Sequence, residues 1–233
     1  MGIFGSLFSD PQGFLLELLY RMPAVLVALS FHEWGHAYAA YKLGDPTARN
    51  LGRMTVNPLH HIDPLGFAML ALVGFGWAKP VPVNPRNFHK LRRDDTIVSL
   101  AGVTVNFILA LIGFAGIYVF AVMGGQNVIL ANMLYYFLSI NLSLMVFNLL
   151  PIPPLDGSHL LQNAFIRITG PKPFIFLQRY GNYILLGLLI TGVISSVLGW
   201  VVSQILTGLT WVFDNIFGFP GLYYLYYVMM GLV

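Results

Sequence analysis

Runs of apolar residues dominate the chain and alternate with short polar turns. Four of these runs are long enough to cross a hydrocarbon core of about 30 Å as α-helices. They cover residues 11–43, 97–123, 128–150 and 183–206. Asp10 is a plausible N-cap for the first run, Pro11 suits its first turn, and Pro23 is expected to kink it. The pattern therefore predicts a bundle of about four full transmembrane helices.

The apolar run at 64–78 is too short for a full crossing, because its residues rise only about 22 Å as a helix. Basic residues flank both of its ends, so both ends are expected on the cytoplasmic side. We interpret the run as a re-entrant or half-spanning segment covered by protein. A short β-like stretch is predicted at 51–57, just before it. The tyrosine-rich tail at 207–233 is expected at the membrane interface.

The composition supports a membrane protein and limits its chemistry. Hydrophobic residues make up 57% of the 233 residues and charged residues 9%, against roughly 45–50% and about 25% in soluble domains. The net charge of +3 is attributed to membrane orientation, so no nucleic-acid partner is expected. The absence of cysteine excludes disulfides, thiolate catalysis and cysteine-bound metal.

Pattern and composition together predict an all-α polytopic membrane protein. We expect one membrane-embedded domain over residues 1–233, with a core at about 12–170. A C-terminal span and an interfacial tail are expected at about 175–233.

The sequence His32-Glu33-Trp34-Gly35-His36 carries the clearest chemical signal. Its two imidazoles are four residues apart, so they lie on one helix face and can bind one tetrahedral metal ion. Glu33 can then act as a base towards water at the metal. A hydrogen-bonded polar cluster is the alternative, but ionisable groups inside an apolar helix are costly and generally mark function.

A catalytic zinc site usually has three protein ligands, so one more must come from elsewhere in the chain. No glutamate follows Glu33, and Ala39 and Lys42 occupy the positions where an extended histidine motif would have Gly and His. An aspartate or another histidine remains. Asp156 is favoured, because it follows a span that returns to the membrane side of His36 and lies in a proline-broken stretch that can bend.

The chain resembles the site-2 protease family of intramembrane zinc metalloproteases, in its short prokaryotic form without a PDZ domain. The resemblance covers residues 30–161 and rests on three ordered motifs. These are Phe31-His32-Glu33-Trp34-Gly35-His36, Asn57-Pro58-Leu59-His60-His61-Ile62-Asp63-Pro64-Leu65-Gly66, and Asn148-Leu149-Leu150-Pro151 with Leu155-Asp156-Gly157. It implies that His32, His36 and Asp156 bind one zinc ion and that Glu33 activates water for peptide hydrolysis.

Two asparagines are further candidate site residues. The resemblance implies that Asn148 holds the substrate backbone or the oxyanion, and Asn148 is also an amide in an apolar helix near the predicted site. Asn106 ends a second family motif at 101–106, in which Val103 stands where proline is usual. A site role for Asn106 and a hydrogen bond between spans both stay open. His32 and Asn106 are each expected about 15 Å below the same membrane surface.

The other histidines are weaker candidates. His159 follows Asp156 by three residues, and we favour a partner that orients the site or an interfacial residue over an extra ligand. His60 and His61 are expected to form turn or interface hydrogen bonds, although metal binding stays open. His89 is assigned to a loop.

The expected function is hydrolysis of a peptide bond in a transmembrane protein substrate, whose helix must unwind locally. Residues 53–57 and the apolar run after Pro64 are candidates to pair with the extended substrate. A metal-ion transporter and a catalytically inactive metal-bound scaffold are the alternatives, and neither needs Glu33. The expected location is a prokaryotic cell membrane, crossed several times, with the active site towards the cytoplasmic side. The expected partners are the substrate and the lipid bilayer.

Overall fold

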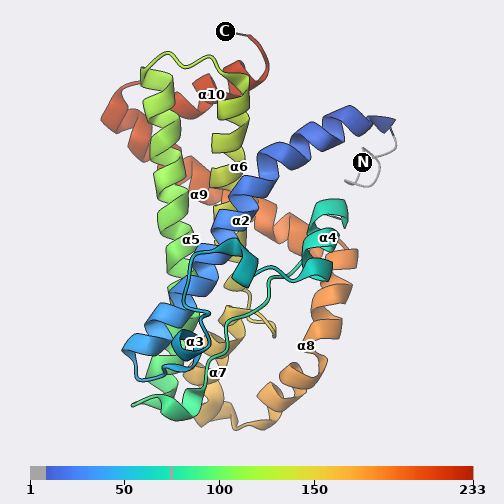
Figure 1. Cartoon of the computed structure of the whole chain (residues 1–233), viewed down its shortest axis with the longest axis vertical. Helices are drawn as coiled ribbons and strands as arrows, with labels where there is room; N and C mark the ends of the chain where they lie inside the picture. Colours follow the sequence, from blue (N-terminus) through green and yellow to red (C-terminus); the bar gives the residue numbers. More distant parts are fainter. Residues whose placement is uncertain (1–8, 74–75, 233) are drawn as a thin grey trace.

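The computed structural model describes residues 9–73 and 76–232 (Figure 1). Over these residues the chain is dominated by α-helix and forms no β-sheet, and strand pairing is limited to one bridge between Ile62 and Ala78. Five of the described helices are long and apolar enough to cross a membrane. The prediction of an all-α polytopic membrane protein is confirmed.

Helices α2 (Pro11–Lys42), α5 (Leu91–Val122) and α6 (Val128–Asn148) form the centre of the fold. α5 and α6 lie side by side as the antiparallel hairpin that their short connection predicts (Figure 1). Helix α2 packs against both with its C-terminal half, where most of its buried residues lie, and its N-terminal half extends away from them (Figure 1). The histidine motif is therefore in the enclosed half of α2.

The starts of these helices follow local sequence signals. The Asp10 side chain accepts a hydrogen bond from the Gly13 N–H at 3.0 Å, and Asn127 caps α6 by accepting from the Leu130 N–H at 3.0 Å. Helix α2 continues through Pro23. The predicted starts at residues 11 and 128 are confirmed.

Two helices occupy the region that the sequence predicts as one span at 183–206. Helices α8 (Lys172–Ile190) and α9 (Val193–Phe217) meet at Thr191 and Gly192, where Gly192 has φ +74°. Hydropathy does not reveal this break, because a left-handed glycine can end a helix within an apolar run. The predicted boundaries are wrong here, and the region supplies two of the five candidate spans.

The helices around this pair complete the C-terminal half. Helix α7 (Asp156–Thr169) precedes α8, and α10 (Gly221–Met229) follows α9. Because α9 extends to Phe217, it includes the first part of the predicted tail at 207–233, so the tail boundary is also wrong. Among the described tail residues, α10 is the separate short helix.

The segment between α2 and α5 folds back on itself. It contains α3 (Thr47–Asn50), α4 (Pro64–Val73) and the 3-10 turns η1 (Pro58–His60) and η2 (Pro85–Asn87). The Ile62–Ala78 bridge and a hydrogen bond from the Lys79 N–H to the His61 carbonyl, at 2.8 Å, join the flanks of the short apolar run. Flanks that meet in this way agree with a re-entrant segment. We call residues 62–78 the re-entrant segment.

The β-like stretch predicted at 51–57 does not form. Gly52 has φ +67°, and Asn57 caps η1 by accepting a hydrogen bond from the Leu59 N–H at 3.1 Å. The Arg53 guanidinium donates to the Lys79 and Pro80 carbonyls at 2.8 and 3.1 Å. Turn-forming glycine and asparagine therefore outweigh the β propensity of this short stretch.

Asp45 joins the end of α2 to the segment before α5. Its buried carboxylate accepts hydrogen bonds from the backbone and hydroxyl of Thr47, from the Asn84 N–H at 2.7 Å and from the Asn87 amide at 2.8 Å. Burial alone would raise the pKa of Asp45, but these hydrogen bonds outweigh it and hold the pKa below its ordinary value. The carboxylate therefore fixes the position of η2 relative to α2.

Replacing Asp45 with Ala is expected to lower the thermal midpoint of the protein in detergent by about 5 °C or more, because several donors lose a charged acceptor. Because the pKa is lowered on folding, the stabilisation is complete above about pH 4 and disappears as the pH falls further. Thermal denaturation between pH 3 and 8 measures both effects. Arg86→Ala, an exposed change in η2, is the control, and an Asp45→Ala midpoint equal to that of the control would contradict the assignment.

Candidate metal centre

Helix α2 places His32 and His36 one above the other, with their Nε2 atoms 2.9 Å apart. The Nδ1 atom of His32 lies 2.6 Å from the Asn106 side-chain oxygen, and Nδ1 of His36 lies 2.8 Å from the Val98 carbonyl. Both partners are acceptors, so each Nδ1 carries the hydrogen in the neutral ring. Each Nε2 atom therefore carries a lone pair that faces the Nε2 atom of the other histidine. This neutral form of the imidazole is the one that binds a metal.

The third group of the cluster is the Asp156 carboxylate at the start of α7. Its Oδ2 atom lies 3.3 Å from Nε2 of His32 and 3.3 Å from Nε2 of His36. It is buried and has no hydrogen-bond donor among the described residues. Three atoms with lone pairs repel one another unless a cation lies between them, so the geometry fits a metal ion held by these three residues.

Two glycines make room for this cluster. A Cβ atom on Gly102 of α5 would lie 2.6 Å from His36 Nε2 and 2.7 Å from His32 Cε1, so only glycine leaves space for both rings. A Cβ on Gly157 would lie 2.2 Å from the Leu149 carbonyl, so glycine lets the start of α7 approach the end of α6. Asp156 directly precedes Gly157, so this close approach places the carboxylate at the end of α6.

One face of α5 contacts both histidines. Val98, Gly102 and Asn106 are spaced four residues apart and therefore lie along one stripe of the helix. Asn106 is fully buried, and its amide also donates to the Ala28 carbonyl at 3.1 Å and to the Asn141 side-chain oxygen at 3.0 Å. These bonds orient the amide so that its oxygen faces His32.

Glu33 lies beside His32 and is anchored by the main chain of a distant segment. Its Oε2 atom accepts a hydrogen bond from the Val81 N–H at 2.7 Å, and the side chain is buried. Val81 follows the re-entrant segment by three residues. One carboxylate oxygen is therefore fixed by the backbone, which leaves Oε1 as the oxygen able to take a proton.

The remaining candidate residues lie outside the three-residue cluster. The Asn148 amide donates to the Leu144 carbonyl of its own helix at 3.0 Å. His159 Nδ1 lies 3.2 Å from an Asp95 carboxylate oxygen, and this carboxylate raises the pKa of His159 above its ordinary value. His159 is thus paired with a carboxylate on α5 and lies outside the candidate metal ligands.

Of the two histidines in the turn, His61 bonds the Thr55 carbonyl through Nε2 at 2.7 Å. This contact confirms the prediction that His61 forms a hydrogen bond within the turn. His60 is exposed at the end of η1.

Sequence reasoning missed three contacts of the site. Asn141 is fully buried against Asn106, and an amide within an apolar helix was the signal that could have identified it. The Val98 carbonyl and the Val81 N–H act through the main chain. No residue type marks such contacts in a sequence.

Several known proteins are similar to this chain in sequence. The sequence model of peptidase family M50 matches residues 119–192, which include Asn148 and Asp156. YwhC of Bacillus subtilis, named as a candidate zinc metalloprotease, is 39% identical over 184 residues, which are 77% of this chain and 84% of YwhC. The chain belongs to peptidase family M50, the site-2 protease family.

Two more relatives of this M50 peptidase also carry zinc metalloprotease names. Rip2 of Mycobacterium tuberculosis is 32% identical over 193 residues, which are 81% of this chain and 71% of Rip2. MJ0611 of Methanocaldococcus jannaschii is 30% identical over 179 residues, which are 75% of this chain and 86% of that protein. No solved structure matches the chain. The M50 peptidase is a multi-pass membrane zinc metalloprotease, and zinc is the metal that its cluster fits.

Replacing Gly102 with Ala is expected to weaken zinc binding at least about tenfold, because the added methyl group pushes the imidazoles away from a geometry that tolerates roughly 0.5 Å. Zinc content after purification and metal titration measure the effect. Gly116→Ala is a matched control on the same helix, where a Cβ would make an ordinary 3.4 Å contact with Leu134. Equal zinc binding by both variants would count against the position of Gly102.

Replacing Asn106 with Ala is expected to lower zinc affinity about 10- to 100-fold, because His32 loses the acceptor that fixes its tautomer and orientation. Asn106→Asp keeps an oxygen acceptor and should recover part of this loss. Asn132→Ala is the control, because the Asn132 amide donates to the Val128 carbonyl of its own helix, α6. Zinc titration of the three variants measures these effects. An Asn106→Ala zinc affinity equal to the wild-type value would contradict the role of Asn106 in orienting His32.

Proposed function

We propose that this M50 peptidase hydrolyses peptide bonds in the transmembrane segments of other membrane proteins. In this proposal residues 1–233 form one protease domain in which His32, His36 and Asp156 hold a single zinc ion and Glu33 is the base. The observation that carries the proposal is the buried Glu33 carboxylate, which is anchored by one oxygen next to a histidine of the cluster. Neither a transporter nor an inactive scaffold needs this carboxylate.

A bound zinc ion polarises a carbonyl group and lowers the pKa of a water molecule towards about 7. Glu33 takes a proton from the attacking water at Oε1 while Oε2 stays bonded to Val81. The water oxygen forms the new bond to the scissile carbonyl carbon, and the carbon–nitrogen bond breaks. Glu33 then passes its proton to the leaving nitrogen, so one group serves as base and then as acid.

Asn148 and Asn106 have different roles in this proposal. Asn148 lies at the C-terminal end of α6, eight residues before Asp156, and is only partly buried. We assign it to the substrate backbone or the oxyanion. Asn106 is fully buried behind His32, so we assign it to the orientation of that ligand.

A large cavity supports a substrate that comes from the membrane. Its volume is about 770 Å³, and its walls come from α2, α4, α6, α8 and α9. Leu29, one turn before His32, and Phe147, next to Asn148, both line it. We propose that a substrate helix enters here and unwinds beside the metal centre, so that its main chain can reach Glu33.

The orientation of the protein follows from its basic residues. Of the twelve Lys and Arg residues, five lie after His36 at or beyond the end of α2 or in the first turn of α5, and they are Lys42, Arg49, Arg53, Arg92 and Arg93. Under the positive-inside rule this end faces the cytoplasm. We therefore propose that the metal centre lies towards the cytoplasmic side. The similar proteins are bacterial and archaeal, which supports our proposal of a prokaryotic cell membrane.

Replacing Glu33 with Gln is expected to leave zinc content unchanged and to lower the rate of cleavage about 10²- to 10⁴-fold, because the amide cannot take the proton. The assay uses protein in lipid vesicles together with candidate membrane substrates. Asp156→Asn, which removes a charged ligand, should lose both zinc and activity. Undiminished cleavage by Glu33→Gln would remove Glu33 as the base, and zinc flux into vesicles without cleavage would favour a transporter.

A further inference from the structure

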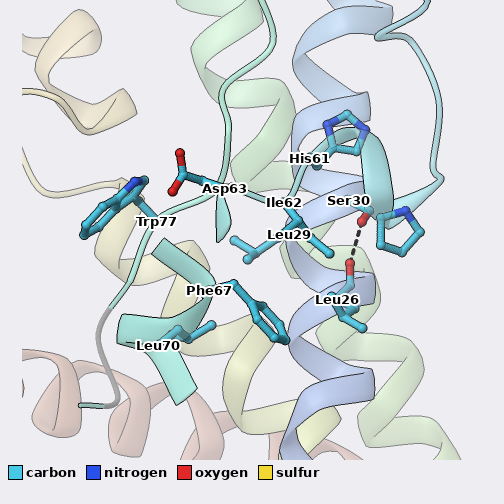
Figure 2. A pocket seen from close by; sticks show the side chains of 11 residues that line it. Leu26, Leu29, Ser30, His61, Ile62, Asp63, Phe67, Leu70 and Trp77 are labelled. Carbon is cyan, nitrogen blue, oxygen red and sulfur yellow. Dashed lines mark hydrogen bonds between the residues drawn. The ribbon is translucent and has the colours of Figure 1, made fainter. Parts of the chain in front are cut away.

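A second, much smaller cavity lies between α2 and the re-entrant segment (Figure 2). Its polar lining residues are Ser30, His61 and Asp63, and the rest of the wall is formed largely by apolar and aromatic side chains such as Phe67 and Trp77. The space in which the centre of a water molecule can move is about 10 Å³. This volume corresponds to about one water molecule.

One of the residues that line this cavity has a buried acceptor atom without a donor among the described residues. His61 is 2% exposed, and its Nε2 atom lies 2.7 Å from the Thr55 carbonyl, which can only accept. Nε2 therefore carries the hydrogen, and the Nδ1 atom of the neutral ring has a lone pair that can accept a hydrogen bond. Nδ1 is buried and has no hydrogen-bond partner among the described residues. A buried acceptor of this kind is costly unless a donor reaches it.

The two other polar residues are also left with acceptor capacity. The Ser30 hydroxyl donates to the Leu26 carbonyl at 2.6 Å, so its lone pairs remain (Figure 2). Asp63 accepts from the Gly66 N–H with Oδ1 at 2.8 Å, and its second oxygen is not used in that bond. The cavity thus presents acceptors and calls for a small ligand that donates two hydrogen bonds.

We propose that this cavity binds one water molecule, which donates to His61 Nδ1 and to the Ser30 hydroxyl oxygen. Water is the ligand that matches both the size and the polarity of the site. A dry cavity, which apolar walls allow, would leave Nδ1 unsatisfied.

The position of this water gives it a structural consequence at the metal centre. Ser30 precedes Glu33 by one turn on the same face of α2. On the facing segment, Ala78 lines the cavity and Val81, three residues later, donates to Glu33. A water that donates to His61 and to Ser30 therefore joins α2 to the turn just before the re-entrant segment, one turn of α2 away from Glu33.

Solid-state NMR on the full chain in lipid vesicles tests the proposal without any activity assay. The six histidines carry ¹⁵N, and His61→Gln assigns the His61 signals. We expect a protonated Nε2 and a non-protonated Nδ1 that receives magnetisation from water protons. A wild-type Nδ1 that carries hydrogen, or that receives no magnetisation from water, would overturn the proposal.

Cavity-filling variants give a second test. Ser30→Val brings two methyl groups into the cavity and should abolish the transfer to His61 Nδ1, and Ala78→Val should do the same from the opposite wall. Ser143→Val, which lines the large cavity on α6, is the matched control and should keep the transfer. Transfer that persists in either folded filling variant would contradict a water held in this cavity.

Discussion

The structure depends on keeping three buried acceptor atoms within a few ångströms of one another. The Nε2 atoms of His32 and His36 belong to α2, and the Oδ2 atom of Asp156 belongs to α7, which is far from α2 in the sequence. Without a cation their mutual repulsion and their lost hydration would favour separation of α7 from α2. Zinc binding and the packing of these helices are therefore linked, because the metal stabilises the arrangement that forms its site.

The fold achieves this arrangement with small residues and main-chain contacts. Glycine at 102 and 157 allows backbones and imidazoles to approach to distances that a Cβ atom would prevent. The orientation of the functional groups is then fixed by the Val98 carbonyl, the Val81 N–H and the Asn106 amide. The membrane supplies no competing water for these hydrogen bonds, so a few of them can determine the geometry of the site.

The parts of the molecule that could be predicted from sequence are those that hydropathy or local chemistry marks. The long helices and the His32, His36 and Asp156 cluster belong to this class. Apolar runs identify the spans, the spacing of the histidines identifies two ligands, and Asp156 is favoured because it follows a span that returns to their side of the membrane. The break at Gly192 and the missing strand at 51–57 depend on glycine conformations that hydropathy does not record. The anchoring of Glu33 depends on a main-chain group, which has no residue signature.

The Val81–Glu33 hydrogen bond has a consequence for how the sequence can change over evolution. Its donor is an amide N–H that nineteen of the twenty residue types share, so drift at position 81 leaves the bond intact unless proline appears there. If Glu33 is the base that we propose, selection acts on the path of the chain from Ala78 to Val81 and only weakly on the identity of residue 81. A residue that positions a functional carboxylate can in this way vary freely among related proteins and escape notice in comparisons of side chains.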